Sequence, residues 1–436
     1  MSMPILALYI DPGTGSMLFT ILVGVLGAGI YAARDGLMKL RFFLSGGRGA
    51  KPSEERLPIA IFSESKRYWN VFGPICEEFE RRGEELHYLT ASPDDPALER
   101  QFRHVHCRFI GEGDKAYAKL GLLKADVLLA TTPGLEVYQW KRSKNVGSYV
   151  HIPHACSDVT LYRMFGLDYY DAVLLSGDYE IRQLEELERL RGLPAKDKVV
   201  VGVTYMDAMR ERLQKAEPLP SHPTTVLLAP SWGESAILSR FGGKILDALL
   251  QSGYHVIVRP HPQSFTAEKE LMERLMREYP DSEQLEWDRS NDNFEVLRRS
   301  DLMISDFSGV IFDFSLVFDK PVIYADTAFD PAPYDACWLD EQPWTFSALP
   351  RIGEKLTEES FPRLRELIEH CLTEPRFQEG REQARAETWA HIGEAASRVA
   401  DDLIARRERL RAKAGDDAAS GDGAAEGEAV KGGCEA

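Results

Sequence analysis

Short apolar runs alternate with segments of helical periodicity from residue 58 to about residue 375. Between them, Glu180–Arg191 is the clearest helical segment, with Leu184, Leu187 and Leu190 at helical spacing. Apolar runs of strand length lie at 59–62, 86–90, 105–110, 127–131, 148–152, 172–175 and 199–203, and again at 226–229, 255–258, 302–305 and 322–324. Strands that alternate with helices are typical of parallel sheets covered on both faces.

A proline-rich break divides this pattern. Pro218, Pro220 and Pro223 fall within six residues, cannot continue a helix, and predict an interdomain linker. Helical spacing resumes beyond it at 243–251, 267–279, 294–299 and 310–318. We therefore predict two doubly wound α/β domains, an N-terminal one over 51–216 and a C-terminal one over 217–413.

The amino end has a different composition. Met17–Ala33 is an uncharged, mostly apolar run, and no Lys or Arg precedes Arg34. Basic residues follow it, among them Lys39 and Arg41. This pattern predicts a membrane anchor in residues 1–50, with one helix at about 17–33 and all later residues on the cytoplasmic side of the inner membrane. The alternative is a buried core helix or hairpin.

The carboxyl end and the overall charge bound the remaining possibilities. Residues 380–413 have a charged helical pattern and are expected to close the C-terminal domain. Residues 414–436 hold six acids against Lys431 and no aromatic residue, which predicts a disordered acidic tail. The net charge of −17 argues against nucleic acid as a partner. Six widely spaced cysteines fit a reducing compartment.

Candidate chemistry is sought after each strand, because ligands of open α/β sheets bind at the carboxyl ends of the strands. The run at 255–258 is followed by Arg259-Pro260-His261-Pro262. Two prolines restrict the backbone around His261, and a rigid His beside an Arg suits phosphate binding or proton transfer. The alternative is a proline-rich turn with a capping His.

A second candidate is the polar turn after the run at 302–305, which begins with Ser305 and Asp306. We expect Ser308 to cap the helix that follows and Gly309 to allow close approach of the backbone. Free amides at such a turn favour an anion, so a phosphate is predicted near Ser308 and Gly309. An ordinary capped helix without a ligand is the alternative. Asp313 lies five residues after Ser308.

The third candidate is His154, which follows the run at 148–152. A His that faces the cleft between the domains is suited to act as a general base. The alternative is a His whose hydrogen bonds are formed within its own loop. His151 lies three residues earlier but on a strand and turn, with no third ligand nearby, so no metal site is predicted. No cofactor is expected, although Mg²⁺ held loosely on a diphosphate is compatible with the sequence. The sequence has no GxxxxGK loop and no GxGxxG, GxSxG or HExxH motif.

These residues resemble the CDP-glycerol glycerophosphotransferase family, the teichoic-acid-type polymerases and primases with the two-domain GT-B fold. Residues 259–262 are similar to its RPHP motif, and 305–314 to its segment of the type SDYSSxxFD. Residues 319–324 are similar to its KPxxxY strand, 228–232 are similar to its strand ending in APT, and 201–207 show a weaker similarity to its GxPxxD turn. In the first domain the family has WHGTxxK, of which this chain keeps His154 and lacks the Trp, the Gly and the Lys; Arg163 is the nearest basic residue.

The resemblance implies transfer of glycerol phosphate, or a similar polyol phosphate, from a CDP-linked donor to an acceptor hydroxyl, with release of CMP. We expect Arg259, Ser305, Asp306, Ser308, Gly309 and Asp313 to bind the donor. Asp313 would orient the donor or His261, and a buried helix acid with a local partner is the alternative for this residue. His261 would balance charge on the departing CMP, and His154 would take the acceptor proton. An anchored enzyme fits a lipid-linked or membrane-associated glycan or polyol acceptor. A glycosyltransferase with a nucleotide-sugar donor and a non-catalytic membrane scaffold are the alternatives.

Overall fold

A computed structural model describes residues 56–422 except 157, 291, 307 and 326–329. The described residues fall in one compact unit that begins at Arg56. The expected anchor at 1–50, with its helix at about 17–33, lies outside them. Among the helices within 56–422, none combines the length and the hydropathy needed to cross a bilayer.

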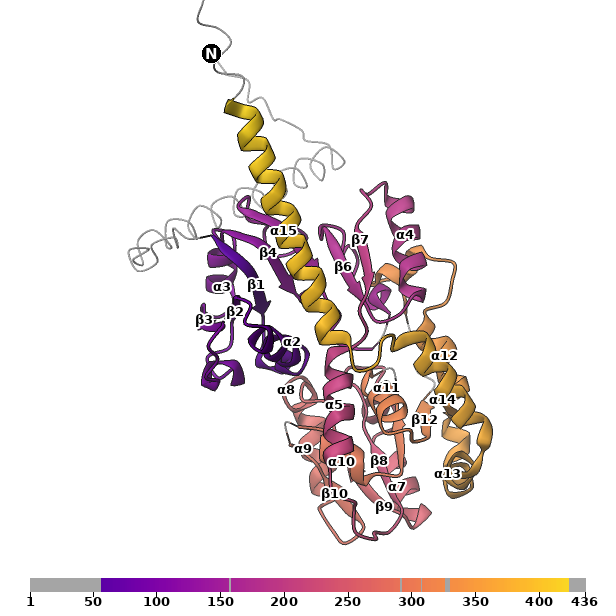
Figure 1. The fold of residues 1–436 in the computed structure, drawn as a ribbon. Coiled ribbons are helices and arrows are strands. Elements are labelled where there is room, and N and C mark those ends of the chain that lie inside the picture. Colours follow the sequence, from indigo (N-terminus) through magenta and orange to yellow (C-terminus); the bar gives the residue numbers. More distant parts are fainter. Residues whose placement is uncertain (1–55, 157, 291, 307, 326–329, 423–436) are drawn as a thin grey trace, which may run out of the picture. The chain divides into compact units, whose positions relative to one another are not determined.

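The first half is built on a seven-stranded sheet in the order β3-β2-β1-β4-β5-β6-β7 (Figure 1). Its strands are β1 (Leu57–Ser63), β2 (Leu86–Thr90), β3 (Val105–Phe109), β4 (Ala125–Ala130), β5 (Val146–His151), β6 (Ala172–Leu175) and β7 (Asp197–Val200). All neighbouring strands pair in parallel, as the alternating pattern predicted. β4 is buried at every residue, which explains its uninterrupted apolar run.

The second half holds a six-stranded parallel sheet in the order β10-β9-β8-β11-β12-β13. Its strands are β8 (Thr225–Leu228), β9 (His255–Val258), β10 (Leu285–Trp287), β11 (Leu302–Ser305), β12 (Val322–Ala325) and β13 (Gly353–Leu356). The expectation of two parallel α/β halves is thus confirmed. The sequence did not predict β10 and β13, which are the two edge strands.

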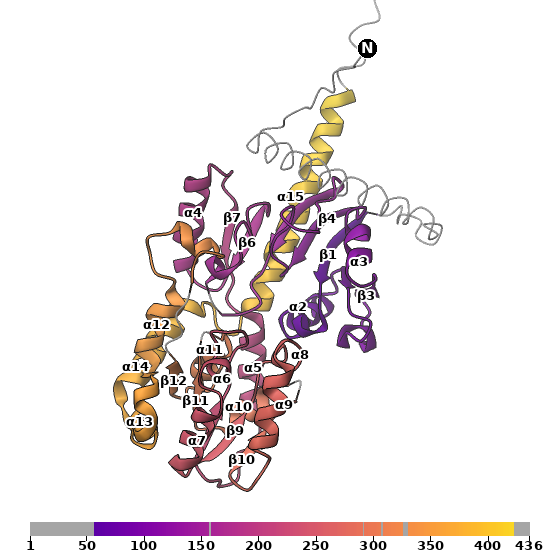
Figure 2. The ribbon, with the colours of Figure 1, turned by 180° about the vertical axis from the view of Figure 1, so that it is seen from behind.

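Helices cover both sheets (Figures 1 and 2). Those of the first half are α2 (Trp69–Arg82), α3 (Asp114–Leu120), α4 (Tyr179–Arg191) and α5 (Thr204–Lys215), with the short turns η2 (Lys66–Tyr68), η3 (Pro96–Glu99) and η4 (Val159–Leu161). The second half has α6 (Ile237–Phe241), α7 (Gly243–Ser252), α8 (Ser264–Ala267), α9 (Lys269–Glu278), α10 (Phe294–Arg299), α11 (Val310–Phe312), the π-helix η5 (Asp313–Val317), η6 (Asp335–Trp338), α12 (Trp344–Ile352), η7 (Glu358–Arg363), α13 (Leu364–Thr373) and α14 (Pro375–Thr388). Residues 217–223, the predicted linker, contain no helix or strand.

The last helix that the structure describes, α15 (Ala395–Asp422), differs from our expectation in two ways. It does not close the second half but returns to the first, where it packs against α2, β1 and β4 (Figures 1 and 2). Val399 and Leu403 are fully buried there, and Asp401 pairs with Arg82 of α2. Residues 414–422, expected to be disordered, continue the helix, while 423–436 lie outside the described residues.

The chain segment that leads into α15 is fixed by the residues around Gly202. Gly202 has φ +88°, and a Cβ at this position would lie 2.2 Å from the carbonyl oxygen of Ala390. Asp207 accepts hydrogen bonds from Trp389 Nε1 at 2.9 Å and from the amide of Gly393 at 2.8 Å. Residues 201–207 therefore fix the position of residues 389–393, through which the chain returns from the second half to the first.

One apolar cluster joins the two halves. It includes Phe72 from α2, Tyr205 from α5, Phe314 from η5 and Leu403 from α15, all of them buried. Because these side chains pack in a common core, the carboxyl edges of the two sheets are held relative to one another.

Candidate active site

Five loops that form the candidate site follow the carboxyl ends of parallel strands, where ligands of such sheets bind. Two belong to the first sheet and three to the second. They are 64–68 after β1, 152–158 after β5, 229–232 after β8, 259–263 after β9 and 306–309 after β11.

The loop after β5 presents His154. Its half-buried ring contacts the rings of Tyr68, at 5.3 Å between centroids, and Tyr162, at 5.9 Å. Its Nδ1 lies 3.5 Å from the hydroxyl of Tyr162. Burial lowers the pKa of His154 to about 4, so the ring is neutral at pH 7.

The far end of this loop is anchored in the second half. Asp158 is buried and accepts hydrogen bonds from the amides of Trp344 at 2.6 Å and Thr345 at 2.8 Å, the first residues of α12. It thereby caps a helix of the other half, where a carboxylate is favoured by the exposed N–H groups. The position of His154 thus depends on contacts from both halves.

The loop after β9 presents His261. Its Nδ1 accepts a hydrogen bond from the amide of Gln263 at 3.1 Å, so the ring proton of the neutral imidazole is on Nε2. Burial and, second, the charge of Arg67 lower the pKa of His261. Trp232, 46% exposed, lies 6.4 Å away between ring centroids. His261 is therefore a neutral hydrogen-bond donor at pH 7.

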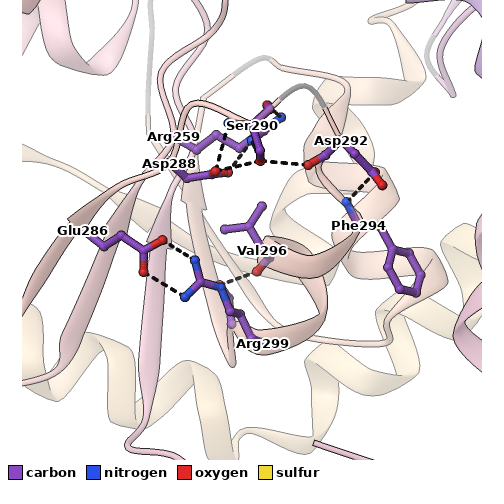
Figure 3. Close-up of polar contacts among 9 residues, drawn as sticks. Arg259, Glu286, Asp288, Ser290, Asp292, Phe294, Val296 and Arg299 are labelled. Carbon is purple, nitrogen blue, oxygen red and sulfur yellow. Dashed lines mark hydrogen bonds and ion pairs between the residues drawn. The ribbon is translucent and has the colours of Figure 1, made fainter. Parts of the chain in front are cut away.

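Arg259 is oriented away from the role we expected. Its guanidinium forms an ion pair with Asp288 and donates to the hydroxyl of Ser290 at 3.1 Å and to the carbonyl of Ser290 at 2.8 Å (Figure 3). Asp288 follows β10, the neighbour of β9, so this pair connects two loops of the sheet edge. Because its charge is already paired, Arg259 is better suited to hold the His261 loop than to bind a donor directly.

Ser305 and Asp306 are also occupied by the protein itself. The hydroxyl of Ser305 donates to the carbonyl of Ala229 at 2.7 Å. Asp306 accepts from the amides of Ser231 at 2.9 Å and Ile237 at 3.2 Å, and burial raises its pKa. Both side chains therefore fix the loop after β8, and neither faces an open ligand position.

Ser308 and Gly309 are half-buried at the turn into α11. The N-cap residue of α11 is Gly309, so the prediction that Ser308 occupies this position is wrong. A Cβ added to Gly309 would lie 3.4 Å from Cβ of Ala155, the neighbour of His154. The structure therefore brings the two motifs singled out in the sequence, one from each half, into contact.

Asp313 is buried in the π-helix η5. Its Oδ1 accepts a hydrogen bond from the hydroxyl of Tyr205 at 2.8 Å, and that hydroxyl accepts from the amide of Cys156 at 3.0 Å. Burial raises the pKa of Asp313 to about 7. Within the described part of the chain, the hydrogen bond of Asp313 goes to Tyr205 and not to His261, and through Tyr205 this residue connects the Gly309 turn to the His154 loop.

Sequence reasoning missed Arg67 and the two tyrosines around His154. Arg67 lies in η2, directly after β1, and is exposed. No ion pair formed by the described part of the chain involves it. Its position after the first strand was a usable signal, but Tyr68 and Tyr162 stand in no recognisable motif. Within the described residues, no group of three or more His, Cys, Asp or Glu side chains is arranged to hold a metal ion.

Comparison with known families gives a match that begins in the first half and covers most of the second. Residues 176–337 match the family model of CDP-glycerol:poly(glycerophosphate) glycerophosphotransferase. The chain is glycerophosphotransferase-like. The match covers both 259–262 and 305–314 and confirms the resemblance noted from these residues. His154 precedes the matched segment.

Solved structures show the fold of this glycerophosphotransferase-like chain. The wall teichoic acid polymerase TagF, in a structure soaked with CDPG, has a TM-score of 0.52 and 14% identity over 87% of this chain and 98% of its own. A UDP-N-acetylglucosamine 2-epimerase has a TM-score of 0.52 and 13% identity over 80% and 96%. Both support a GT-B-like arrangement of two parallel sheets. A search of curated proteins gave no match.

Proposed function

We propose that this glycerophosphotransferase-like chain transfers glycerol phosphate, or a similar polyol phosphate, from a CDP-linked donor to a hydroxyl of a membrane-associated acceptor. CMP is the second product. One observation carries the proposal: the segment that matches the family contributes Gly309, which faces Ala155 next to His154. Residues suited to phosphate and hydroxyl chemistry thus come from both halves.

The donor is bound by charge and hydrogen bonds from three loops. Arg67 supplies the cation, because Arg259 is paired with Asp288 whereas Arg67 is exposed and close enough to lower the pKa of His261. His261 offers Nε2–H to the phosphate of the departing CMP. The turn at Ser308 and Gly309 lies against the diphosphate, with the amide of Ser308 donating to Asp306. An Mg²⁺ ion on the diphosphate would add to this charge balance.

The transfer is an in-line substitution at phosphorus. The acceptor oxygen forms a bond to the phosphorus that carries the polyol, and the bond from that phosphorus to the bridging oxygen breaks. CMP leaves with the bridging oxygen. The hydroxyl proton passes either to His154, if one of its ring nitrogens is free, or to the phosphate of CMP. Positioning and charge stabilisation supply most of the rate enhancement in such reactions.

A membrane-associated acceptor is supported by the sequence before residue 56. The expected anchor at 1–50 would hold the catalytic unit at the cytoplasmic face of the inner membrane. Arg34, Lys39 and Arg41 would attract anionic lipids there. A lipid-linked glycan or polyol presents its growing end at this surface.

Donor binding tests the proposal. Binding of CDP-glycerol, CDP-ribitol, UDP-glucose and CMP to the full-length chain is measured by calorimetry. We expect saturable binding of a CDP-alcohol, weakened about tenfold or more by Arg67→Gln and by His261→Ala, because each removes a contact to phosphate. Arg81→Gln and His222→Ala are the matched controls, since both residues are exposed and outside the five loops.

The outcomes separate the competing functions. Preference for UDP-glucose would favour a glycosyltransferase over the phosphotransferase. Absence of binding to all four compounds by folded protein would refute the donor assignment and favour the scaffold. Equal weakening by the control variants would refute the roles given to Arg67 and His261.

A further inference from the structure

A chain of three side chains connects the core of the first half to His154. Nε2 of His151 lies 3.2 Å from the hydroxyl of Tyr162, and the same hydroxyl lies 3.5 Å from Nδ1 of His154. One hydroxyl carries one proton, so it donates to one imidazole and accepts from the other. The position of a proton on His151 therefore determines which nitrogen of His154 is protonated.

The surroundings of His151 decide which partner donates in the hydrogen bond between His151 and Tyr162. Its ring is fully buried between the rings of Tyr162 and Tyr170, at 5.3 and 5.0 Å between centroids. Among the residues that the structure describes, none provides a hydrogen-bond partner for its Nδ1. Among backbone groups, a buried N–H without a partner is rarer than a buried C=O without one, and we apply the same preference to the imidazole nitrogens. The proton of the neutral ring therefore belongs on Nε2, from which it is donated to the oxygen of Tyr162.

The remaining steps follow from this assignment. The hydroxyl of Tyr162, which accepts from His151, donates its own proton to Nδ1 of His154. A neutral His154 then carries its ring proton on Nε2. The nitrogen that is not bound by Tyr162 is consequently a donor and has no free lone pair.

We infer that His154 acts as a hydrogen-bond donor to the transferred phosphate rather than as the base, with Tyr162 and His151 as positioning residues that fix its tautomer. This inference rests on the proposed function. His154 Nε2–H stabilises the non-bridging oxygens of the phosphate as the new bond to the acceptor oxygen forms. The hydroxyl proton ends on the phosphate of CMP, whose second pKa is about 6, so protons and charge balance without a protein base.

The lowered pKa of His154 agrees with the role of a neutral donor. Burial lowers its pKa to about 4, which makes the ring a weak proton acceptor for an alcohol. A neutral N–H donor needs no titration and keeps its function throughout the neutral range.

Nitrogen NMR of the full-length chain, labelled with ¹⁵N-histidine, reads the tautomer without any substrate. We expect the Nε2–H pattern for both His151 and His154, with Nδ1 of His154 at a hydrogen-bonded position. Tyr162→Phe is expected to move the Nδ1 resonance of His154 to that of a free acceptor. Tyr169→Phe, at an exposed tyrosine, is expected to leave it unchanged. An Nδ1–H pattern for His154 in the unaltered protein overturns the inference.

Turnover of a CDP-alcohol separates donor from base. The side-chain amide of His154→Gln donates a hydrogen bond but cannot take up a proton. We expect this variant to keep kcat within about tenfold of the unaltered enzyme, whereas His154→Ala loses about 100-fold or more. Equal losses in both variants contradict the donor role. Failure of the unaltered enzyme to turn over any CDP-alcohol would refute the proposed function, while the NMR result would still decide the tautomer.

Discussion

Tyr205→Phe tests the connection between the two halves of the site. The phenol oxygen of Tyr205 accepts from the amide of Cys156 at 3.0 Å and donates to Asp313 at 2.8 Å, and all three residues are buried. The substitution removes one oxygen atom and keeps the ring. It therefore removes both hydrogen bonds and leaves the amide and the carboxyl buried without this partner.

The magnitude follows from those two contacts. A buried amide left without a partner costs about 1–3 kcal/mol, and a lost hydrogen bond to a charged group about 1.5–3 kcal/mol. Protonation of Asp313 offsets part of the second cost, so we expect the free energy of unfolding to fall by about 3 kcal/mol. Donor turnover is expected to fall as well, because the His154 loop loses its connection to the Gly309 turn.

Urea denaturation of the full-length chain, followed by tryptophan fluorescence, measures the change at constant m. Tyr169→Phe is the control: Tyr169 is 50% exposed, and its loss is expected to change stability by no more than about 0.5 kcal/mol. A similarly small change for Tyr205→Phe would refute the reasoning. Asp313→Asn in the Tyr205→Phe background is expected to be non-additive, because the two residues share one hydrogen bond.

Two further changes probe the buried acid and the crossover. Burial raises the pKa of Asp313 to about 7, so its stabilising effect is complete below about pH 4 and is lost as the pH rises to 7. Asp313→Asn cannot ionise, so its free energy of unfolding is expected to rise relative to that of the unaltered protein by up to about 1.4 kcal/mol per pH unit in this window. Denaturation at pH 5, 6 and 7 measures this difference. Gly202→Ala would bring a Cβ to 2.2 Å from the carbonyl of Ala390 and is expected to cost about 3 kcal/mol or more in thermal denaturation. Gly192→Ala, at φ +61° with nothing within 4 Å, is expected to cost only about 1 kcal/mol, and equal losses would contradict the steric argument.

Interior strands were predictable because both of their faces are buried. β2, β6, β9 and β11 have the bounds that their apolar runs predict. β10 and β13 have the sequences LEW and GEKL, and each pairs with only one neighbour at the edge of the sheet. These two edge strands are short and polar and carry no apolar run, so the pattern could not reveal them, whereas the edge strand β3 of the first sheet was predicted from its run at 105–110.

The loops of the site were predictable, but the tasks of their side chains were not. His154, His261 and the Gly309 turn follow strands of a recognisable pattern. Arg259 looked like a donor ligand because its partner Asp288, 29 residues away, is visible only once β9 and β10 are paired. Arg67 approaches His261 from the other half of the chain, which no local pattern encodes. The tautomer of His154 depends on burial of His151, again a property of the packed structure.

The return of α15 to the first sheet has a consequence for biosynthesis. The faces of α2, β1 and β4 that receive Val399 and Leu403 stay uncovered until the last helix has left the ribosome. The chain from the end of β7 at Val200 to the start of α15 at Ala395 takes roughly 10–40 s to synthesise at typical elongation rates. During this interval the nascent first half exposes apolar surface that chaperones recognise. A ribosome stalled before residue 395 would therefore carry an unfinished amino-terminal half, even though all seven of its strands had already been translated.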